Sequence, residues 1–479
     1  MCYNRQEHTI ISLRKGMAMS HNVNHSENNT TCSNANCKAA RCGSAPCSPN
    51  LNEDHHHEHA AADYRVKQSK FAYGLVRTLS KFVSRFIFKK KLVRNEIKDK
   101  KGPFVIIANH EAALDFVNLI GVTKQPLTFV ISNSFYSTLP FKSVTSRLGM
   151  IPKQQFQTSL KDIHKMKTAI DDGKILVIYP AGLMSDDGTP TPTPVATYGF
   201  LKWLKADVYV AKTVGTYFSM PKWRTDGLRA GKTLMDIYRL FDKDELAEKS
   251  AEEIQQITDE ALYFDAYEDQ EKLLVKYKRG NNIEGLENVL YICPHCGKEF
   301  TMKVRDKSVI YCEACGYEET CDEFGFLHNS CGFGEEIRHP SKWNQIIDDA
   351  VFEKIEKGEL TSLESKVDVH LIPEGKSKFA KAGEAILKLT HDSFVLTGTI
   401  NGKEEELTVS TNCFASLPYK PGKYIEVQNA ETIYRCYPEN GKMAAKFVDT
   451  VEAFYKKHSA ECARVHECNK ECAASGDRV

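Results

Sequence analysis

The stretch Phe104-Val-Ile-Ile-Ala-Asn-His-Glu-Ala-Ala-Leu-Asp115 decides the fold of this chain. Its first five residues are all apolar, and a run without polar alternation is typical of a strand in a parallel sheet that helices cover on both faces. His110 and Asp115 follow the strand. Five residues turn a regular helix by about 140°, so the two cannot share one helical face. We therefore expect His110 at the strand end and Asp115 reaching back from the first turn of a helix.

The pair His110 and Asp115 has the chemistry to make a hydroxyl nucleophilic. A neutral imidazole takes the hydroxyl proton, while a carboxylate fixes the imidazole tautomer and stabilises the imidazolium that forms. A solvated loop histidine is the alternative interpretation of an isolated His-x-x-x-x-Asp match. What favours catalysis is an ordered set of segments downstream.

Those segments also predict the architecture. Further apolar runs at 127–131, 175–179 and 208–214 are expected strands. A helix between the second and third is predicted by Leu160, Ile163, Lys167 and Ile170, with Ser159 as its cap and Gly173 as its stop. Strands that alternate with helices predict an α/β sheet covered by helices. Ligands of such sheets bind at the strand ends, where His110 and Pro180 fall.

Two of the segments carry recognisable blocks, Leu148-Gly-Met-Ile-Pro-Lys153 and Ile175-Leu-Val-Ile-Tyr-Pro-Ala-Gly-Leu-Met-Ser185. With the His-x-x-x-x-Asp block before them, their order resembles the glycerolipid acyltransferase family, which includes 1-acylglycerol-3-phosphate acyltransferase, over roughly residues 65 to 285. The resemblance implies that His110 and Asp115 are catalytic. It also implies that Asn109, Gly149, Pro180 and Gly182, which match motif positions, help to bind substrate.

The blocks depart from the family pattern at the acceptor site. Where the family has Glu-Gly-Thr-Arg, this chain has Ala181-Gly-Leu-Met184, and the arginine expected some six residues after Gly149 falls on Gln155. Arg147 and Lys153 lie nearby and are the candidates for contact with an acceptor phosphate, although lysine is a point charge and not a bidentate fork. We therefore expect acyl transfer, with the identity of the acceptor left open.

A basic amphipathic segment precedes the first block. Apolar residues recur at helical spacing from Phe71 to Phe86, and the window 64–94 holds ten Lys and Arg and no acidic residue. Such a stretch is typical of a helix, or a helix pair, on a membrane surface. A helix that packs its apolar face on the domain is the alternative.

Composition sets the broad class. A length of 479 residues predicts several domains, and a net charge of +1 gives no case for nucleic acid. No apolar run is long enough to span a membrane, and the first residues lack the core of a signal peptide. Sixteen cysteines in a long chain, four of them in metal spacing, indicate a reducing cytoplasm. The expected location is cytoplasmic, at the membrane periphery.

Two C-x-x-C knuckles, Cys293 to Cys296 and Cys312 to Cys315, have zinc-ribbon spacing. They predict one structural Zn²⁺ held by four thiolates, with a disulfide pair or a redox dithiol as alternatives. Acidic residues are dense in this module, which disfavours a phosphate-binding surface.

The last third reads as antiparallel strands closed by a helix. Asn401-Gly402 between the segments 394–400 and 403–409 predicts a hairpin with a type I′ turn, and 424–427 with 432–437 predicts a second strand pair. Such a module resembles pleckstrin-homology-like or GRAM-like domains. The expected organisation is a disordered Cys/His-rich tail (1–62), a basic helical segment (63–98), an acyltransferase domain (99–286), a zinc ribbon (287–332), a helical linker (333–364), a β-rich domain (365–460) and a tail (461–479).

The leading hypothesis is a membrane-associated acyltransferase of phospholipid biosynthesis. Acyl-CoA or acyl carrier protein would donate the acyl chain, and a lysophospholipid such as 1-acylglycerol-3-phosphate would accept it. A catalytically silent lipid-binding or regulatory scaffold is the alternative, motivated by the altered residues Ala181, Leu183 and Met184. A nucleic-acid-binding zinc protein is disfavoured by the neutral chain and the acidic ribbon.

Overall fold

The computed structural model describes residues 64–139, 145–155, 159–411, 414–429 and 432–474, with side chains described as far as residue 460. The Cys/His-rich tail expected at 1–62 lies outside these residues. The described residues up to Tyr455 form one compact unit, to which the contacts below belong. Within the described residues, no helix has both the length and the apolar character needed to cross a membrane.

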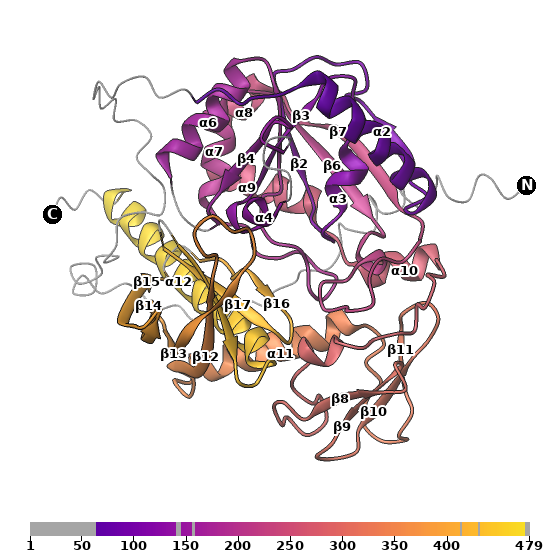
Figure 1. Ribbon diagram of the computed structural model, residues 1–479, viewed down its shortest axis with the longest axis vertical. Helices are drawn as coiled ribbons and strands as arrows, with labels where there is room; N and C mark the ends of the chain where they lie inside the picture. The colour runs from indigo at the N-terminus through magenta and orange to yellow at the C-terminus, as the bar shows by residue number, and fades with distance from the viewer. Residues whose placement is uncertain (1–63, 140–144, 156–158, 412–413, 430–431, 475–479) are drawn as a thin grey trace, which may run out of the picture. The chain divides into compact units, whose positions relative to one another are not determined.

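A seven-stranded, mostly parallel sheet is the centre of the N-terminal half (Figure 1), in the order β1-β7-β6-β2-β5-β3-β4. β2 runs parallel to β5 and β6, β3 runs parallel to β4 and β5, and β6 and β7 are antiparallel. The strands are β1 (Lys91–Asn95), β2 (Phe104–Ala108), β3 (Leu127–Ser132), β4 (Met150–Lys153), β5 (Ile175–Ile178), β6 (Val208–Val214) and β7 (Leu234–Phe241).

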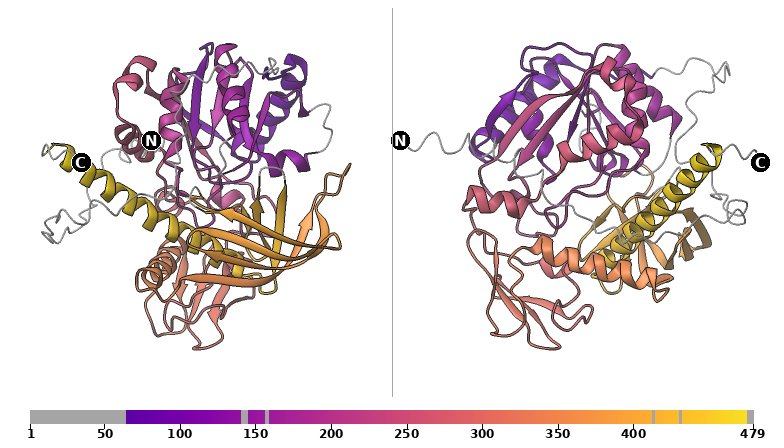
Figure 2. Two further views of the ribbon diagram at one scale, coloured as in Figure 1. Left: turned by 90° about the vertical axis from the view of Figure 1, so that its left-hand side faces the viewer. Right: turned by 180° about the vertical axis from the view of Figure 1, so that it is seen from behind.

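Helices cover both faces of this sheet (Figure 2), as the apolar strands require. Val105 and Ile107 of β2 point to a core that includes residues of α6 (Leu160–Asp171), α7 (Ala196–Leu204) and α9 (Ala251–Leu262). Phe104 and Ile106 point to the opposite core, with residues of α2 (Lys70–Phe86) and α3 (Asp115–Leu119). The short helices α4 (Asn133–Thr138), α8 (Lys243–Glu248) and α10 (Ala266–Leu273) complete the half. The predicted α/β class is confirmed.

The helical segment expected at 63–98 is shorter in the structure. α2 begins after Ser69, whose side chain accepts a hydrogen bond from the amide of Ala72, and ends at Phe86. Residues 91–95 then form β1, which pairs with β7 at the edge of the sheet. Strand pairing with β7, which is distant in sequence, thus replaces the second helix of a helix pair.

The C-terminal half contains a small sheet and a large one. The small sheet, in the order β11-β10-β9-β8, holds β8 (Met302–Arg305), β9 (Val309–Cys312), β10 (Glu318–Cys321) and β11 (Leu327–Asn329). The large sheet has the order β15-β14-β13-β12-β18-β17-β16. Its strands are β12 (Ser362–Leu371), β13 (Ala380–Thr390), β14 (Ser393–Ile400), β15 (Lys403–Ser410), β16 (Tyr419–Lys420), β17 (Tyr424–Gln428) and β18 (Ile433–Pro438). Asn401 and Gly402 between β14 and β15 both have positive φ, as a type I′ turn requires.

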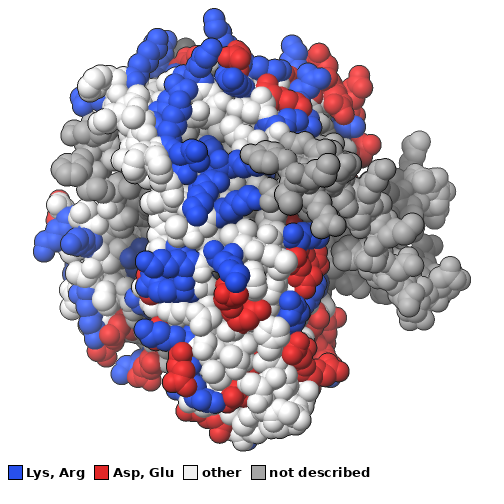
Figure 3. Space-filling model, turned by 90° about the vertical axis from the view of Figure 1, so that its right-hand side faces the viewer, with Lys and Arg blue, Asp and Glu red and all other residues white. Residues whose placement is uncertain are grey.

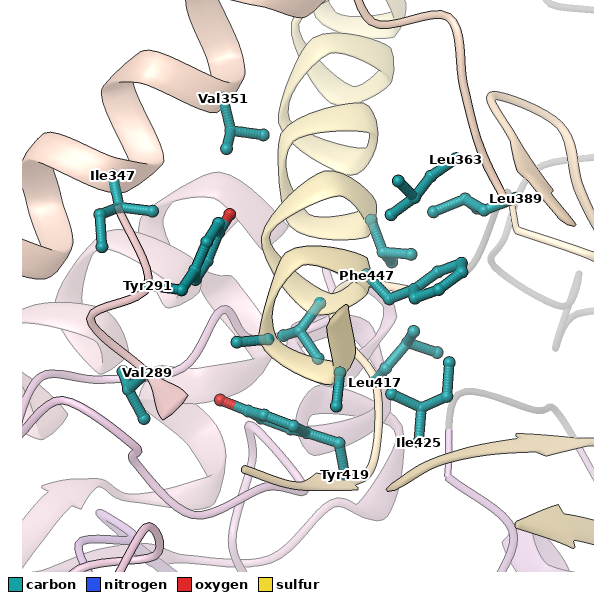
Figure 4. Packing of buried hydrophobic residues seen from close by; sticks show 14 of the residues in the cluster. Val289, Tyr291, Ile347, Val351, Leu363, Leu389, Leu417, Tyr419, Ile425 and Phe447 are labelled. Carbon is teal, nitrogen blue, oxygen red and sulfur yellow. The ribbon is translucent and has the colours of Figure 1, made fainter. Parts of the chain in front are cut away.

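One apolar cluster joins both C-terminal sheets to two helices, α11 (Pro340–Glu356) and α12 (Met443–Ala474). Figure 4 shows Ile347 and Val351 of α11 and Phe447 of α12 on either side of Tyr291. The same cluster contains Cys293 and Cys312 of the small sheet. The ribbon segment therefore shares its core with the β-rich domain. α12 continues to Ala474, so the predicted tail 461–479 begins as helix.

Candidate active site

The turn between β2 and α3 carries a His–Asp dyad. The ring nitrogen Nδ1 of His110 lies 3.0 Å from Oδ2 of Asp115, the first residue of α3. The same oxygen accepts the amide of Ala112 at 2.9 Å, so the loop itself holds the carboxylate. The Asp115 side chain is 2% exposed and that of His110 is 20% exposed. With Nδ1 protonated and bonded to Asp115, Nε2 is the nitrogen that can take a proton.

Asn109 fixes this turn to the neighbouring strand β6. Its amide nitrogen donates to the carbonyl oxygen of Thr213 at 2.7 Å, and its amide oxygen accepts the Thr213 amide at 2.8 Å. Asn109 is buried, so its side chain serves the protein framework beside His110. Substrate contact, implied for Asn109 by the family resemblance, stays a prediction.

The block after β5 meets the dyad directly. The ring of Tyr179 lies 4.4 Å from that of His110, and the amide of Ser185 donates to the His110 carbonyl at 3.0 Å. Burial raises the pKa of the Tyr179 phenol well above its usual value, so this ring is neutral beside His110. Gly182 has a φ of +71°, which lets its amide turn back to the Tyr179 carbonyl at 2.9 Å. Pro180 is buried between them.

The residues of the middle block divide between the two ends of β4. Lys153 ends the strand at the same edge as His110 and Gly182, because β2, β4 and β5 all run in the same direction. Arg147 and Gly149 precede the strand. The Arg147 carbonyl accepts the Ser69 amide at 2.8 Å, and a Cβ on Gly149 would meet the Gln68 side chain.

A strand of four residues spans ~13 Å at ~3.3 Å per residue. Arg147 and Lys153, the two candidates for contact with an acceptor phosphate, therefore lie on opposite sides of β4. The Nζ of Lys153 donates to the Gln154 carbonyl at 3.0 Å, and burial lowers the pKa of this amine.

Apolar and amide side chains occupy the corner where the family pattern has charged groups. Leu183 is buried and Met184 is half-buried. The side-chain amide of Gln155 donates to the carbonyl oxygen of Gly182, which ties the middle block to the third. The altered residue Gln155, two residues after Lys153, is thus hydrogen-bonded within the protein to the altered third block.

The large C-terminal sheet contacts the same edge of the N-terminal sheet, which sequence reasoning did not foresee. Gln428 donates to the Gln155 carbonyl at 2.6 Å, and Gln154 donates to the Asn429 carbonyl at 3.2 Å. Further hydrogen bonds join Ser134 to Glu426 at 2.8 Å and Tyr419 to Asp186. The segments that follow β3, β4 and β5 therefore all bond to β16, β17 or the residue after β17.

Comparison with known proteins identifies the N-terminal half. The model of the family described as Acyltransferase matches residues 89–218. Residues 89–218 form an acyltransferase domain. Among solved structures, the chain is similar to the 1-acyl-sn-glycerophosphate (LPA) acyltransferase PlsC from Thermotoga maritima, at 16% identity and a TM-score of 0.34, over 40% of this chain and 77% of that one. No curated protein matches the chain.

Outside the acyltransferase domain, four cysteines form a group that can hold a metal ion. The sulfur atoms of Cys293, Cys296, Cys312 and Cys315 all lie within 4.8 Å of one another. Cys293 and Cys315 are 3.7 Å apart, and Cys296 and Cys312 are 3.8 Å apart. A tetrahedral site with Zn–S bonds of ~2.3 Å places its sulfurs ~3.8 Å apart, whereas a disulfide needs ~2.05 Å. The spacing fits a four-thiolate site.

Glu111, Thr213 and Tyr179 also belong to the active site, although none was singled out from sequence. Glu111 stands in the first block next to His110 and is fully buried. Glu111 is a charged residue in a mostly apolar stretch, since Ala112-Ala113 follow it and an apolar strand lies before the block. A carboxylate in such a stretch could have been recognised as a candidate buried charge. Thr213 and Tyr179 fall inside apolar strand patterns, where nothing distinguishes them from core residues.

Proposed function

We propose that this chain is a membrane-associated glycerolipid acyltransferase. It moves an acyl chain from a thioester, on coenzyme A or acyl carrier protein, to a hydroxyl of a lysophospholipid. The observation that carries the proposal is the His110–Asp115 dyad at the carboxyl ends of parallel strands, within a domain of the Acyltransferase family.

The dyad supplies general base and general acid catalysis. Nε2 of His110 takes the proton of the acceptor hydroxyl as its oxygen attacks the thioester carbonyl. Asp115 holds the ring through Nδ1 and stabilises the imidazolium. When the tetrahedral intermediate collapses, the C–S bond breaks, the new C–O ester bond remains, and His110 returns the proton to the thiolate. Atoms and charge balance without any cofactor.

Lys153 is the side chain we propose for the acceptor phosphate, since it ends β4 at the His110 edge. Burial lowers the pKa of its amine, while the nearby carboxylate of Asp162 raises it. The first acceptor to test is therefore 1-acylglycerol-3-phosphate.

Helix α2 supports association with a membrane surface. Phe71, Leu75, Leu79, Phe82 and Phe86 form one exposed stripe, with between 59% and 87% of each residue accessible to solvent. We call this set the α2 stripe. Exposed basic residues accompany it (Lys70, Lys81, Arg85, Lys89), and the helix has no acidic residue. Figure 3 shows the side of the molecule on which α2 lies in Figure 1, where Lys and Arg form a band.

A row of apolar side chains this exposed on a helix indicates a surface that binds a partner or a membrane. Tyr73, Ser80 and Ser84 pack on the domain instead, so the stripe is the face of α2 that the domain leaves open. An apolar stripe flanked by Lys and Arg is the pattern of a helix that lies in the headgroup region of an anionic bilayer.

The four-cysteine group is proposed to hold one structural zinc ion. Four thiolates leave no open position for a substrate, so its role is to fix the ribbon segment against the shared core. The hydroxyl of Thr301 lies 3.2 Å from the Cys312 sulfur and can donate to it.

The test is acyl transfer by the purified full chain, compared with His110→Ala. Long-chain acyl-CoA and acyl carrier protein serve as donors, and 1-acylglycerol-3-phosphate is offered beside uncharged lyso-lipids. His164→Ala is the matched control, because His164 is an exposed histidine on α6. Transfer that is lost in His110→Ala and kept in His164→Ala supports the proposal. A folded, metal-loaded protein that transfers to no acceptor would instead indicate a lipid-binding scaffold.

A further inference from the structure

Glu111 has no part in the chemistry above, yet it lies in the same turn as both members of the dyad. Its side chain is 0% exposed, directly after His110 in the turn that leads to Asp115. An ionised carboxylate in such a place is costly unless it is paired. The structure gives Glu111 hydrogen bonds but no cation within salt-bridge distance among the described residues.

Those hydrogen bonds tie the catalytic turn to the segment after β6. Oε2 of Glu111 accepts the Thr216 hydroxyl and the Tyr217 amide, both at 2.9 Å. Oε1 lies 3.4 Å from the amide nitrogen of Asn109, which is itself paired with Thr213. The residues on either side of His110 are thus both fixed to 213–217, and His110 has little freedom to move away from Asp115.

The charges around Glu111 come from several elements. Asp115 of α3 and Asp269 of α10 oppose its ionisation, while Lys212 of β6 and the phenol of Tyr277 also face it. Burial, followed by the charge of Asp115, raises the pKa of Glu111 to about 8. At neutral pH Glu111 is therefore mostly protonated, which leaves the negative charge of this pair on Asp115.

We propose that Glu111 is a positioning residue of the acyltransfer reaction, which holds the His110 turn on the β6 segment and whose ionisation would disturb the neighbouring dyad. The proposal rests on the proposed function. Ionisation would keep the bonds to Thr216 and Tyr217, because a carboxylate accepts them more strongly than a carboxylic acid does. It would also place a second buried negative charge near Asp115, and repulsion between the two carboxylates would disturb the His110–Asp115 pair.

Two substitutions separate position from charge. Glu111→Gln keeps the shape and an acceptor oxygen for Thr216 and Tyr217, and it cannot ionise. Glu111→Ala removes the link altogether. At pH 7 we expect Glu111→Gln to keep activity within about threefold of the unmodified chain, and Glu111→Ala to lose about tenfold or more in kcat with little change in KM for either substrate.

The decisive measurement is the pH profile of kcat from pH 6 to 10. The unmodified chain should lose activity as pH rises through about 8, and Glu111→Gln should keep its activity to higher pH. Glu319→Gln is the matched control, since Glu319 is also 0% exposed and lies in the ribbon segment. It should leave the alkaline decline in place. Lys212→Met tests the other candidate for that decline, because burial lowers the pKa of Lys212.

An alkaline decline that is unchanged in Glu111→Gln, or full activity in Glu111→Ala, would overturn the proposal. The role of Glu111 can also be tested without measuring acyl transfer, in case no acceptor is found. In protein labelled with ¹³C-histidine, the ring signal of His110, assigned by its loss in His110→Ala, should shift as pH passes through about 8 and should not do so in Glu111→Gln. An inactive chain that shows this shift would contradict the proposed function alone. An active chain that lacks it would contradict the role of Glu111 alone.

Discussion

Replacing Leu75 and Leu79 by glutamate tests whether the α2 stripe binds membranes. The two residues are 70% and 63% exposed, one helical turn apart. Full burial of a leucine is worth ~1.5–3 kcal/mol, so burying the exposed part of each contributes ~1–2 kcal/mol. The double change should cost ~2–4 kcal/mol of membrane affinity, and since ~1.4 kcal/mol is tenfold, binding should weaken roughly 30-fold to several hundred-fold.

The assay is co-sedimentation of the full chain with vesicles of phosphatidylcholine, with and without anionic phosphatidylserine. Glutamate has nearly the helix propensity of leucine, so α2 should persist, which far-UV circular dichroism checks. Leu160→Glu is the matched control, because Leu160 is 61% exposed but lies on α6, over the opposite face of the sheet. Equal binding by the double variant and the unmodified chain would refute the reasoning. An equal loss in Leu160→Glu would also refute it, since the effect would not be specific to α2.

Three more predictions follow from the geometry. Asp115→Asn should lower kcat by ~10²–10⁴ with little loss of stability, measured by acyl transfer and urea unfolding, since an amide can hold His110 but cannot stabilise its imidazolium. Cys315→Ser should reduce bound zinc in metal analysis and lower the melting temperature, whereas Cys436→Ser, at a buried cysteine outside the group, should leave zinc content unchanged. Burial and the neighbouring Asp186 raise the pKa of Asp187 to about 7. A raised carboxyl pKa stabilises the fold at low pH, and this stability is lost as pH rises from ~4 toward that value, so the urea midpoint should fall over this range less steeply in Asp187→Asn.

The sequence predicted the strands whose side chains are apolar on both faces. β2, β5 and β6 appear as uninterrupted apolar runs, and the turn chemistry of Asn401-Gly402 predicted the β14–β15 hairpin. These elements are determined by local composition, which is why the pattern is visible without the fold. The juxtaposition of His110 and Asp115 followed from the same logic, since a strand end and a helix start are adjacent in the chain.

Elements that depend on distant pairing were not predicted. Asp236 and Arg239 interrupt the apolar residues of β7, and Lys91, Arg94 and Asn95 do the same in β1, so neither resembles the buried strands of a parallel sheet. β7 lies between β1 and β6, where the chain pairs segments far apart in sequence. The contacts of Gln428 and Tyr419 with the catalytic edge have the same origin, because nothing local to those residues indicates their partners. The closeness of Arg147 and Lys153 in sequence likewise did not show that they lie at opposite ends of β4.

The position of β7 has a practical consequence for dissecting this protein. The acyltransferase match ends at residue 218, while β7 begins at Leu234 and completes the sheet between β1 and β6. A fragment cut at 218 would leave the edge of β6 without its neighbour and would detach β1, the strand that follows α2. Extending the fragment through β7 would still leave Asp186 and the Gln155 carbonyl without the bonds they receive from Tyr419 and Gln428. A loss of activity could be attributed to chemistry, and not to an unfinished sheet, only in a piece that extends at least through β18, which joins β16 and β17 to the rest of the large sheet.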